Sequence, residues 1–242
     1  MKDSYYEGRV AVVTGAGGTL CSEIAVDLAQ KGARVVLVGR TREKLERTAQ
    51  RIAADGGAGW VYPCDVTDEA AVRAMAAEVA AQWGSCRFLV NGAGGNRIAA
   101  MTTIPAFDPA ELADDRPESL RGFFNLSMAD FAAVLQANTM GTVIPTQAFA
   151  QQMAADGGVV LNFASMNTYR PLSRVAPYAM SKAAVANLTQ WLAAYLAPAH
   201  IRVNAVAPGF MVNERSRQYL GTVEDGLTAR GERVIAHTPM GR

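Results

Sequence analysis

Six short apolar runs, each followed by a stretch with helical spacing or a long turn, restrict the possible folds of this chain most strongly. The runs cover residues 10–13, 34–38, 59–62, 88–91, 159–163 and 202–205. Between them, apolar residues recur every three or four positions, as at Ile24 and Leu28, which predicts amphipathic helices. Alternation of this kind predicts a parallel sheet with helices on both faces. Nearly continuous apolar strands are typical of a sheet that is covered on both sides.

Length and composition suit one domain of this class. The chain has 242 residues and half of them are hydrophobic, enough for the core of a single α/β domain in three layers over residues 1–242. With 23 basic and 22 acidic residues, charge gives no reason to expect a nucleic-acid partner. No signal-peptide pattern and no window near the roughly 18 apolar residues of a membrane span is present. We therefore expect a cytoplasmic protein without a membrane partner.

Cysteine and histidine usage predicts no metal site. The spacings of Cys21, Cys64 and Cys86 match no metal-binding pattern, and reduced, partly buried thiols are the expected state. His200 and His237 are the only histidines, and neither has neighbours in the sequence that would complete a ligand set.

The segment from residue 94 to about 126 interrupts the alternation. It has little periodicity and contains Pro105, Pro109 and Pro117. A loop of this length in a compact domain is usually functional or partly disordered. Because it follows the fourth apolar run, we expect it at the carboxyl edge of the sheet, on the substrate side, where ligands bind in open α/β folds.

The first apolar run ends in the segment TGAGGTLC, residues 14–21. Gly15, Gly17 and Gly18 leave the backbone open to close approach, and a helical pattern follows them. Amides at a helix N-terminus, together with the helix dipole, favour a phosphate group. The turn by itself leaves two interpretations open, a dinucleotide site and a flexible turn without a ligand.

The end of the second run bears on the kind of dinucleotide. An NAD site commonly has a carboxylate there for the ribose hydroxyls. Here Gly39 leaves that space empty and Arg40 supplies a guanidinium, which suits a 2′-phosphate. The sequence favours NADP(H), while NAD(H) and a solvated basic start of a helix remain alternatives.

A tyrosine and a lysine downstream form the pattern Y-x-x-x-K. Tyr178 and Lys182 would share one face of a helix, and a nearby ammonium lowers the pKa of a phenol. Such a phenol can exchange a proton with an alcohol or carbonyl oxygen near neutral pH. Ser165 follows the fifth run and Asn138 lies in the preceding helical stretch, so both are candidates for the same site.

Taken in order and spacing, these segments resemble the short-chain dehydrogenase/reductase family over nearly the whole chain. TGAGGTLC stands at the cofactor glycine motif, Cys64-Asp65-Val66 at the adenine contact, and NGAG (91–94) at the N-x-A-G turn. RVNAVAPG (202–209) matches the strand and Pro-Gly turn that closes over the nicotinamide. The resemblance implies a Rossmann-type, doubly wound sheet and hydride transfer between a nicotinamide and a carbonyl or alcohol carbon.

The resemblance also implies a role for each site residue. Tyr178 would act as general acid/base, and Lys182 would lower the pKa of Tyr178 and hold the nicotinamide ribose. Ser165 would orient the substrate oxygen, and Asn138 would hold a water for proton relay. The implied cofactor-binding residues are Gly15, Gly17, Gly18, Thr19, Leu20, Arg40, Asp65, Val66, Asn91, Ala93, Gly94, Tyr178, Lys182, Pro208 and Gly209.

Two positions of the glycine turn depart from the family pattern. Thr19 and Cys21 stand where family members usually have glycine. Both side chains are compact, so we expect the phosphate site to survive with altered packing around it.

Several segments resemble one subgroup of the family, the D-mannonate oxidoreductases, which interconvert D-fructuronate and D-mannonate. They are TGAGGTLC, NGAGGN (91–96), SMNTYRPL (165–172), TQWLAAYLA (189–197) and AHTPMGR (236–242). A sugar acid needs a cation for its carboxylate and polar groups for its hydroxyls. The expected substrate residues are Asn96, Met166, Asn167, Arg170 and Arg174. A reductase for another keto-sugar acid, such as 5-ketogluconate, and a non-catalytic regulatory member remain alternatives.

The resemblance finally implies an assembly. Family members commonly pair through the helices that correspond to residues 127–155 and 176–198, where Phe131, Trp191 and Tyr195 would face outward. We therefore expect a homodimer or a homotetramer. Family members also continue beyond the AHTPMGR segment with another helix and a seventh strand, so we expect either a truncated chain or a protein without that strand.

Overall fold

The computed structural model describes residues 4–222 and 225–241, and the contacts within it divide the chain into two compact units. The first unit is Met1–Ala207 and the second is Pro208–Arg242. The first unit contains all six strands that the sequence predicts, and with them most of the candidate site residues.

The first unit is built on a six-stranded sheet in the order β3-β2-β1-β4-β5-β6, with every neighbouring pair parallel. Its strands confirm the six predicted runs, each longer than predicted by one or two residues. They are β1 Val10–Thr14, β2 Arg34–Gly39, β3 Ala58–Pro63, β4 Cys86–Asn91, β5 Gly158–Phe163 and β6 Ile201–Val206.

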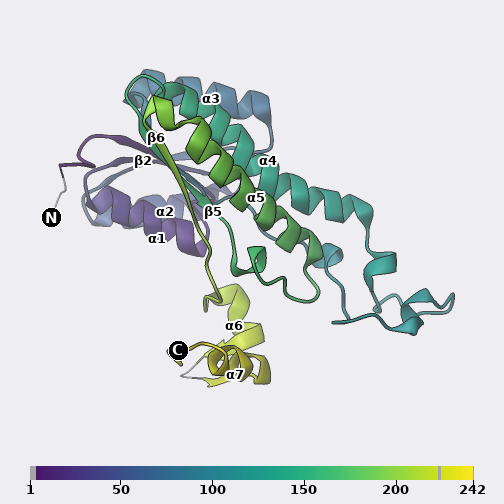
Figure 1. The fold of residues 1–242 in the computed structure, drawn as a ribbon. Helices are drawn as coiled ribbons and strands as arrows, with labels where there is room; N and C mark the ends of the chain where they lie inside the picture. The colour runs from purple at the N-terminus through teal and green to yellow at the C-terminus, as the bar shows by residue number, and fades with distance from the viewer. Residues whose placement is uncertain (1–3, 223–224, 242) are drawn as a thin grey trace. The chain divides into compact units, whose positions relative to one another are not determined.

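Helices cover both faces of this sheet (Figure 1). One layer consists of α1 (Thr19–Gln30) and α2 (Arg42–Ala54), and the other of α3 (Glu69–Trp83), α4 (Met128–Met153) and α5 (Ala176–Tyr195). Side chains of a strand alternate between faces, and β1 divides accordingly. Ala11 and Val13 pack with the α1 and α2 side, whereas Val10 and Val12 pack with the α3, α4 and α5 side. The predicted doubly wound fold is confirmed.

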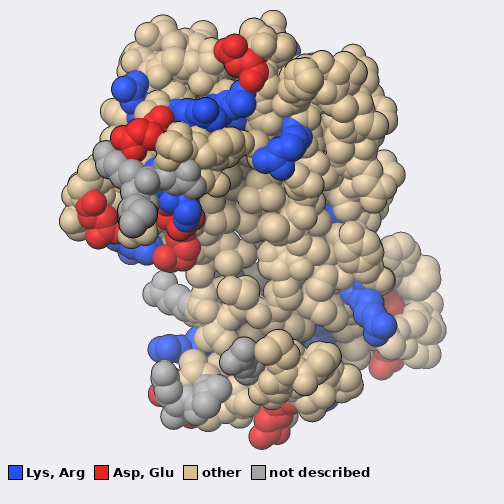
Figure 2. Space-filling model, turned by 60° about the vertical axis from the view of Figure 1, so that its left-hand side comes forward, with Lys and Arg blue, Asp and Glu red and all other residues tan. Residues whose placement is uncertain are grey.

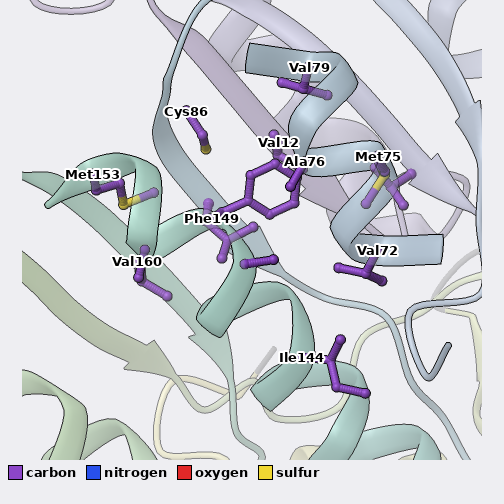
Figure 3. Packing of buried hydrophobic residues seen from close by; sticks show 14 of the residues in the cluster. Val12, Val72, Met75, Ala76, Val79, Cys86, Ile144, Phe149, Met153 and Val160 are labelled. Atoms are coloured by element: carbon purple, nitrogen blue, oxygen red, sulfur yellow. The ribbon is translucent and has the colours of Figure 1, made fainter. Parts of the chain in front are cut away.

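The core below α3 and α4 is packed around one aromatic ring. Figure 3 shows Phe149 of α4 between Met75 and Ala76 of α3 and Val12 of β1, and the side chain of Phe149 is fully buried. Because protein interiors are close-packed, this cluster fixes how α3 and α4 lie on the sheet. The position of α4 in turn places Asn138, which lies nearer the N-terminal end of the same helix.

The predicted long loop lies between β4 and α4 and contains three short 3₁₀ turns, η1 Ile98–Ala100, η2 Pro109–Leu112 and η3 Phe123–Asn125. Polar contacts with the backbone order it. The Arg121 guanidinium donates to the carbonyls of Met101 (2.6 Å) and Ile98 (2.9 Å). The buried Glu111 carboxylate accepts from the amide of Phe124 at 3.2 Å. Each of these contacts depends on a single side chain, so the periodicity of the sequence could not predict them.

The second unit is small. It contains α6 (Glu214–Leu220), the antiparallel strands β7 (Gly221–Thr222) and β8 (Gly226–Leu227), and α7 (Ala229–Ala236). The hydroxyl of Thr228 caps α7 by accepting from the amide of Gly231 at 3.1 Å. A hydroxyl at this position stabilises a helix start.

The surface carries no extended field of one sign on the face drawn in Figure 2, where basic and acidic side chains are interspersed. Within the described residues, no helix combines the length and apolar character that crossing a bilayer requires. The three cysteines are buried free thiols.

Candidate functional site

The sheet order reverses between β1 and β4, and the turns that follow these two strands meet there. Ligands in open α/β folds bind at such a point. Gly15, with φ +70°, lies so close to the other turn that a Cβ on it would be 2.7 Å from the carbonyl oxygen of Gly92. Only glycine combines that backbone conformation with so little space.

A threonine joins these two turns, although the sequence analysis did not select it. The buried hydroxyl of Thr14 accepts hydrogen bonds from the amides of Gly92 (3.1 Å) and Ala93 (3.2 Å). A signal was available in the sequence, because Thr14 is the last residue of the first strand and directly precedes Gly15. A second contact, from the Thr48 hydroxyl of α2 to the carbonyl of Ala16 at 2.9 Å, holds the turn from the other side.

The glycine turn has the features that a pyrophosphate needs. Gly18 is the N-cap of α1, no side chain caps this helix start, and the first turn of the helix carries no acidic residue. The first amides of α1 are therefore left for an anion, which the helix dipole favours. At Gly17 a Cβ would lie 2.6 Å from the Cβ of Lys44, so this position also requires glycine. These residues fit a dinucleotide phosphate group.

The two departures from the family pattern do not fill this turn. Thr19 is exposed at the start of α1. Cys21 is buried, and its Sγ occupies the space that a Cβ on Gly92 would need. The thiol of Cys21 therefore fits because Gly92 has no side chain. This agrees with the altered packing that we expected from the compact side chains of Thr19 and Cys21.

The predicted hydroxyl and lysine constellation comes together at the end of β5. Ser165 follows that strand, and it lies close enough to Tyr178, on the first turn of α5, to lower the pKa of that phenol. Lys182 is buried on the next turn of α5, where its Nζ lies 5.8 Å from the centre of the Tyr178 ring. Two segments, the end of β5 and the first two turns of α5, therefore place an alcohol, a phenol and an amine in one site.

The pKa values in this constellation correct one expectation. Burial raises the pKa of Tyr178 above its ordinary value, and Ser165 opposes this. Lys182 is not among the groups that shift the pKa of Tyr178, and its Nζ donates to the carbonyl of Phe163 at 2.7 Å. Burial lowers the pKa of Lys182 to about 8, and the nearby Cys21 thiol acts in the opposite direction.

The side chain of Asn138 is committed to the turn after β4. Its Oδ1 accepts from the amide of Gly95 at 3.0 Å, and its Nδ2 donates to the carbonyls of Gly95 and Val134, both at 2.8 Å. Gly94, with φ +148°, passes so close that a Cβ on it would overlap with the Asn138 Oδ1. Asn138 therefore holds this turn against α4, and its predicted role in proton relay stays a prediction.

Asn91 differs from what the family motif implied for cofactor binding. The side chain is buried and its Nδ2 donates to the hydroxyl of Thr146 (2.8 Å) and to Oδ1 of Asn162 (2.9 Å). It therefore points into the interior between the sheet and α4. Any contact of Asn91 with a cofactor is limited to its main chain, whereas Ala93 and Gly94 lie in the turn itself.

The expected adenine end of the site lies after β2 and β3. The Asp65 carboxylate accepts from the amide (2.9 Å) and the hydroxyl (2.8 Å) of Thr67. These two bonds lower the pKa of Asp65, and Arg40 contributes in the same direction. Arg40 is exposed and Val66 is buried. The structure therefore brings the candidate 2′-phosphate ligand Arg40 and the candidate adenine residue Asp65 near each other.

The expected substrate residues fall into two groups. Asn167 is buried and supports Ser165, because its Nδ2 donates to the Ser165 hydroxyl (3.4 Å) while its Oδ1 accepts from the amide of Leu172 (2.9 Å). Arg170 and Arg174 are exposed, and Arg174 has a positive φ of 74°. Met166 and Asn96 are half-buried, and the Asn96 side chain accepts from the amide of Arg97 at 3.0 Å.

Pro208 and Gly209 open the second unit of the chain. Their expected contact with a nicotinamide therefore stays a prediction. No group of three or more His, Cys, Asp or Glu side chains that could hold a metal ion is present among the described residues.

A doubly wound sheet with a glycine turn at its switch point and a Ser-Tyr-Lys constellation beside it defines a nicotinamide-dependent oxidoreductase. The model of the short chain dehydrogenase family matches residues 9–221. The chain belongs to this family.

Relatives of known sequence or structure support the same assignment. An uncharacterized oxidoreductase of Haemophilus influenzae is 36% identical over 98% of this chain and 81% of its own length. The crystal structure of a proposed D-mannonate oxidoreductase from Haemophilus, with bound NAD, has a TM-score of 0.89 at 34% identity and covers 98% of this chain and 83% of its own. A proposed NAD(P)-dependent gluconate 5-dehydrogenase from Beutenbergia cavernae, with bound NADP, has a TM-score of 0.77 at 32% identity, covering 98% and 84%.

The contact between Cys21 and Gly92 predicts a non-additive pair of substitutions. Gly92→Ala places a methyl group against the Cys21 sulfur, and overpacking of this kind costs about 1–3 kcal/mol. We expect a lower melting temperature and weaker nicotinamide binding, measured by thermal unfolding and by cofactor fluorescence. The double variant Cys21→Gly/Gly92→Ala should recover most of both losses. Losses that simply add in the double variant would contradict the proposed contact, and Cys21→Ala alone serves as the control.

The buried Lys182 predicts a stability effect that depends on pH. Below pH 8 the ammonium is charged in both the folded and the unfolded state, so burial of the charge opposes folding. As pH rises from about 8 towards the ordinary lysine value, the folded state loses its proton first and this penalty disappears. Lys182→Met should therefore raise the free energy of unfolding at pH 7, by at most roughly 3 kcal/mol, and the gain should shrink between pH 8 and 10.5.

Denaturant titrations of the wild type and Lys182→Met at pH 7 and pH 9.5 measure this difference. Lys44→Met, which removes a lysine whose Cβ lies at the glycine turn, is the control for loss of positive charge. A wild type that is more stable than Lys182→Met at pH 7 would contradict the prediction.

Proposed function

We propose that this enzyme interconverts a keto-sugar acid and the corresponding sugar acid by hydride transfer with a nicotinamide cofactor, with D-fructuronate and D-mannonate as the substrate pair. The observation that carries the reaction class is the meeting of Ser165, Tyr178 and Lys182 beside the glycine turn. The cofactor supplies the hydride chemistry, and the protein binds and orients the reactants.

Each residue of the constellation has a defined task in this proposal. The Tyr178 hydroxyl donates a proton to the substrate oxygen during reduction and accepts one during oxidation. The Ser165 hydroxyl donates a hydrogen bond to the same oxygen, and Asn167 holds that hydroxyl in place. Lys182 binds the ribose hydroxyls of the cofactor, and the amides at the start of α1 bind its pyrophosphate.

The substrate class rests on chemistry and on likeness to relatives. The relatives named as proposed D-mannonate oxidoreductase and gluconate 5-dehydrogenase both concern sugar acids. Arg170 and Arg174 border the segment between Ser165 and α5, and no ion pair joins either to an acidic side chain among the described residues. One of these arginines is our candidate for the substrate carboxylate. The likeness to a gluconate 5-dehydrogenase makes 5-ketogluconate the second candidate substrate. A regulatory protein that binds the cofactor without turnover is the distant alternative.

We further propose that NADP(H) is preferred over NAD(H). Gly39 ends β2 without a side chain, and the exposed Arg40 follows it. A planar guanidinium suits the 2′-phosphate of NADP, whereas NAD sites commonly use a carboxylate at this place.

Assembly and compartment belong to the same proposal. Trp191 and Tyr195 of α5 stack at 4.6 Å between ring centres, and both are more than half exposed. Phe131 of α4 is half-buried. A second copy that covers this apolar face of α5 would form a homodimer or a homotetramer, and we place the enzyme in the cytoplasm.

Substitution of the proposed acid/base tests the reaction class. The wild type should oxidise NADPH when D-fructuronate is added, followed at the nicotinamide absorbance, with 5-ketogluconate as the comparison substrate. Tyr178→Phe should lower kcat by about 10²-fold or more, because a general acid typically contributes 10²–10⁴-fold. Tyr6→Phe, on a phenol that packs against Phe88, should keep wild-type activity. Retention of more than about a tenth of kcat in Tyr178→Phe would exclude the acid/base role.

The cofactor proposal is tested at Arg40. Arg40→Ala should raise KM for NADPH by about tenfold, the effect of losing one charge-assisted contact of about 1.4 kcal/mol, and should leave KM for NADH nearly unchanged. Arg42→Ala is the matched control, since the Arg42 guanidinium is exposed and already lies 3.8 Å from Glu46. A wild type that uses NADH better than NADPH would contradict the proposed preference.

A further inference from the structure

A continuous chain of buried polar side chains crosses the first unit from α4 through β4 and β5 to α5. Asn91 of β4 donates to Thr146 of α4 (2.8 Å) and to Asn162 of β5 (2.9 Å), and Asn162 donates to Thr189 of α5 (2.9 Å). All four side chains are buried, and Asn162 is fully so. We call these four residues the polar ladder.

The directions of the ladder bonds are fixed by its ends. The hydroxyl of Thr146 donates to the carbonyl of Thr142 (2.7 Å), and that of Thr189 donates to the carbonyl of Val185 (2.7 Å). A hydroxyl has a single proton, so both threonines can only accept from the asparagines. The amide nitrogens of Asn91 and Asn162 must therefore point as they do, and any axial shift of either helix would break a buried bond.

The ladder ends on the two helices that carry three of the candidate catalytic residues. Thr146 lies eight residues after Asn138 on α4, and Thr189 lies seven residues after Lys182 on α5. Both separations are close to two helical turns, about 10.5–12 Å along the axis, so each threonine lies on the same side of its helix as the candidate catalytic residue. On β5, the ladder residue Asn162 is also next to the site, because it directly precedes Phe163, whose carbonyl accepts from Lys182.

Packing alone would not hold α5 at one axial position. The residues of α5 that face the core next to Thr189 include Val185 and Leu192. Apolar contacts are non-directional, whereas a buried hydrogen bond is lost with a small displacement and leaves an unpaired polar group behind. Within the site, the distance between Lys182 and the Phe163 carbonyl and the closeness of Ser165 to Tyr178 both depend on that axial position.

We propose that Thr189 and Asn162 are positioning residues, which set the axial position of α5 on β5 and thereby hold Tyr178 and Lys182 against Ser165. Neither residue touches a reacting atom. The proposal rests on the reaction class proposed above, because it concerns how the acid/base constellation is held.

The test compares Thr189→Val, which keeps the side-chain shape and removes the hydroxyl, with Thr189→Ser, which keeps the hydroxyl. A small misplacement of reacting groups can cost about 10²-fold in rate, so we expect kcat of Thr189→Val to fall at least about tenfold. KM for the cofactor should change by a smaller factor than kcat, because the proposed pyrophosphate site at the glycine turn and α1 is not part of the ladder and only the contact of Lys182 with the ribose is affected. The apparent pKa in the pH profile of kcat/KM should rise, since the effect of Ser165, which lowers the pKa of Tyr178, would weaken. Thr189→Ser should restore both quantities.

The control is Val185→Ala, which removes buried packing from the same helix face and keeps the ladder. It should lower the melting temperature while kcat and the pH profile stay close to wild type. If Thr189→Val loses only thermal stability, or if Val185→Ala causes the same loss of kcat, the ladder is merely structural and the proposal is overturned. Should Thr189→Val not fold, Asn162→Leu/Thr189→Val replaces both partners of the bond between β5 and α5 by apolar groups. Asn91 loses one acceptor in this variant and keeps its bond to Thr146, and kcat should show the same fall.

A wild type without turnover on any sugar acid would disprove the proposed substrate and not the ladder. The ladder is then decided by the crystal structure of Thr189→Val. The expected result is loss of the 2.7 Å bond between Lys182 and the Phe163 carbonyl, and an unchanged bond would overturn the proposal.

Discussion

The whole site depends on two backbone turns that approach each other where the sheet reverses its order. Gly15 after β1 can lie this close to Gly92 after β4 only because Gly15 has no side chain, and the hydroxyl of Thr14 links the two turns. The missing side chain at Gly92 leaves room for the Cys21 thiol in the place of a family glycine. A constraint on backbone spacing therefore explains both the residues that fit the family pattern and one that departs from it.

Burial of Lys182 is the second constraint, and it sets function against stability. The ammonium is removed from water, has one carbonyl partner, and has its pKa lowered to about 8 by burial. Nothing in the packing of α5 requires a charge at this position, so the stability lost by burying this charge is consistent with the cofactor-binding task that we propose for the amine. Strain or desolvation at a functional site that is offset elsewhere is a general feature of enzymes.

The fold was predictable because it rests on periodicity. Each of the six strands is an apolar run, and residues such as Leu45 and Ile52 mark the buried face of a helix. The meeting of the candidate catalytic residues was predictable because Ser165, Tyr178 and Lys182 stand in the order and spacing of a known family. The direction of buried polar side chains was not. Asn91 was expected at the cofactor, but its side chain donates to Thr146 and Asn162. This could not be predicted, because these partners lie on a helix and a strand that are close to Asn91 only in the folded protein.

Under the proposed function, substrate recognition and acid/base chemistry both depend on how α4 and α5 are held. The loop between β4 and α4 is attached to α4 through the bonds of Asn138 with Gly95, and to the segment before α5 through the Thr102 amide, which donates to the Arg174 carbonyl at 3.1 Å. Under the proposed function, we expect substitutions at the loop surface that spare these bonds to alter which sugar acid is accepted. Changes within the buried polar residues act on both helices at once. Substrate preference can therefore diverge among relatives of this chain while the arrangement of Ser165, Tyr178 and Lys182 stays the same.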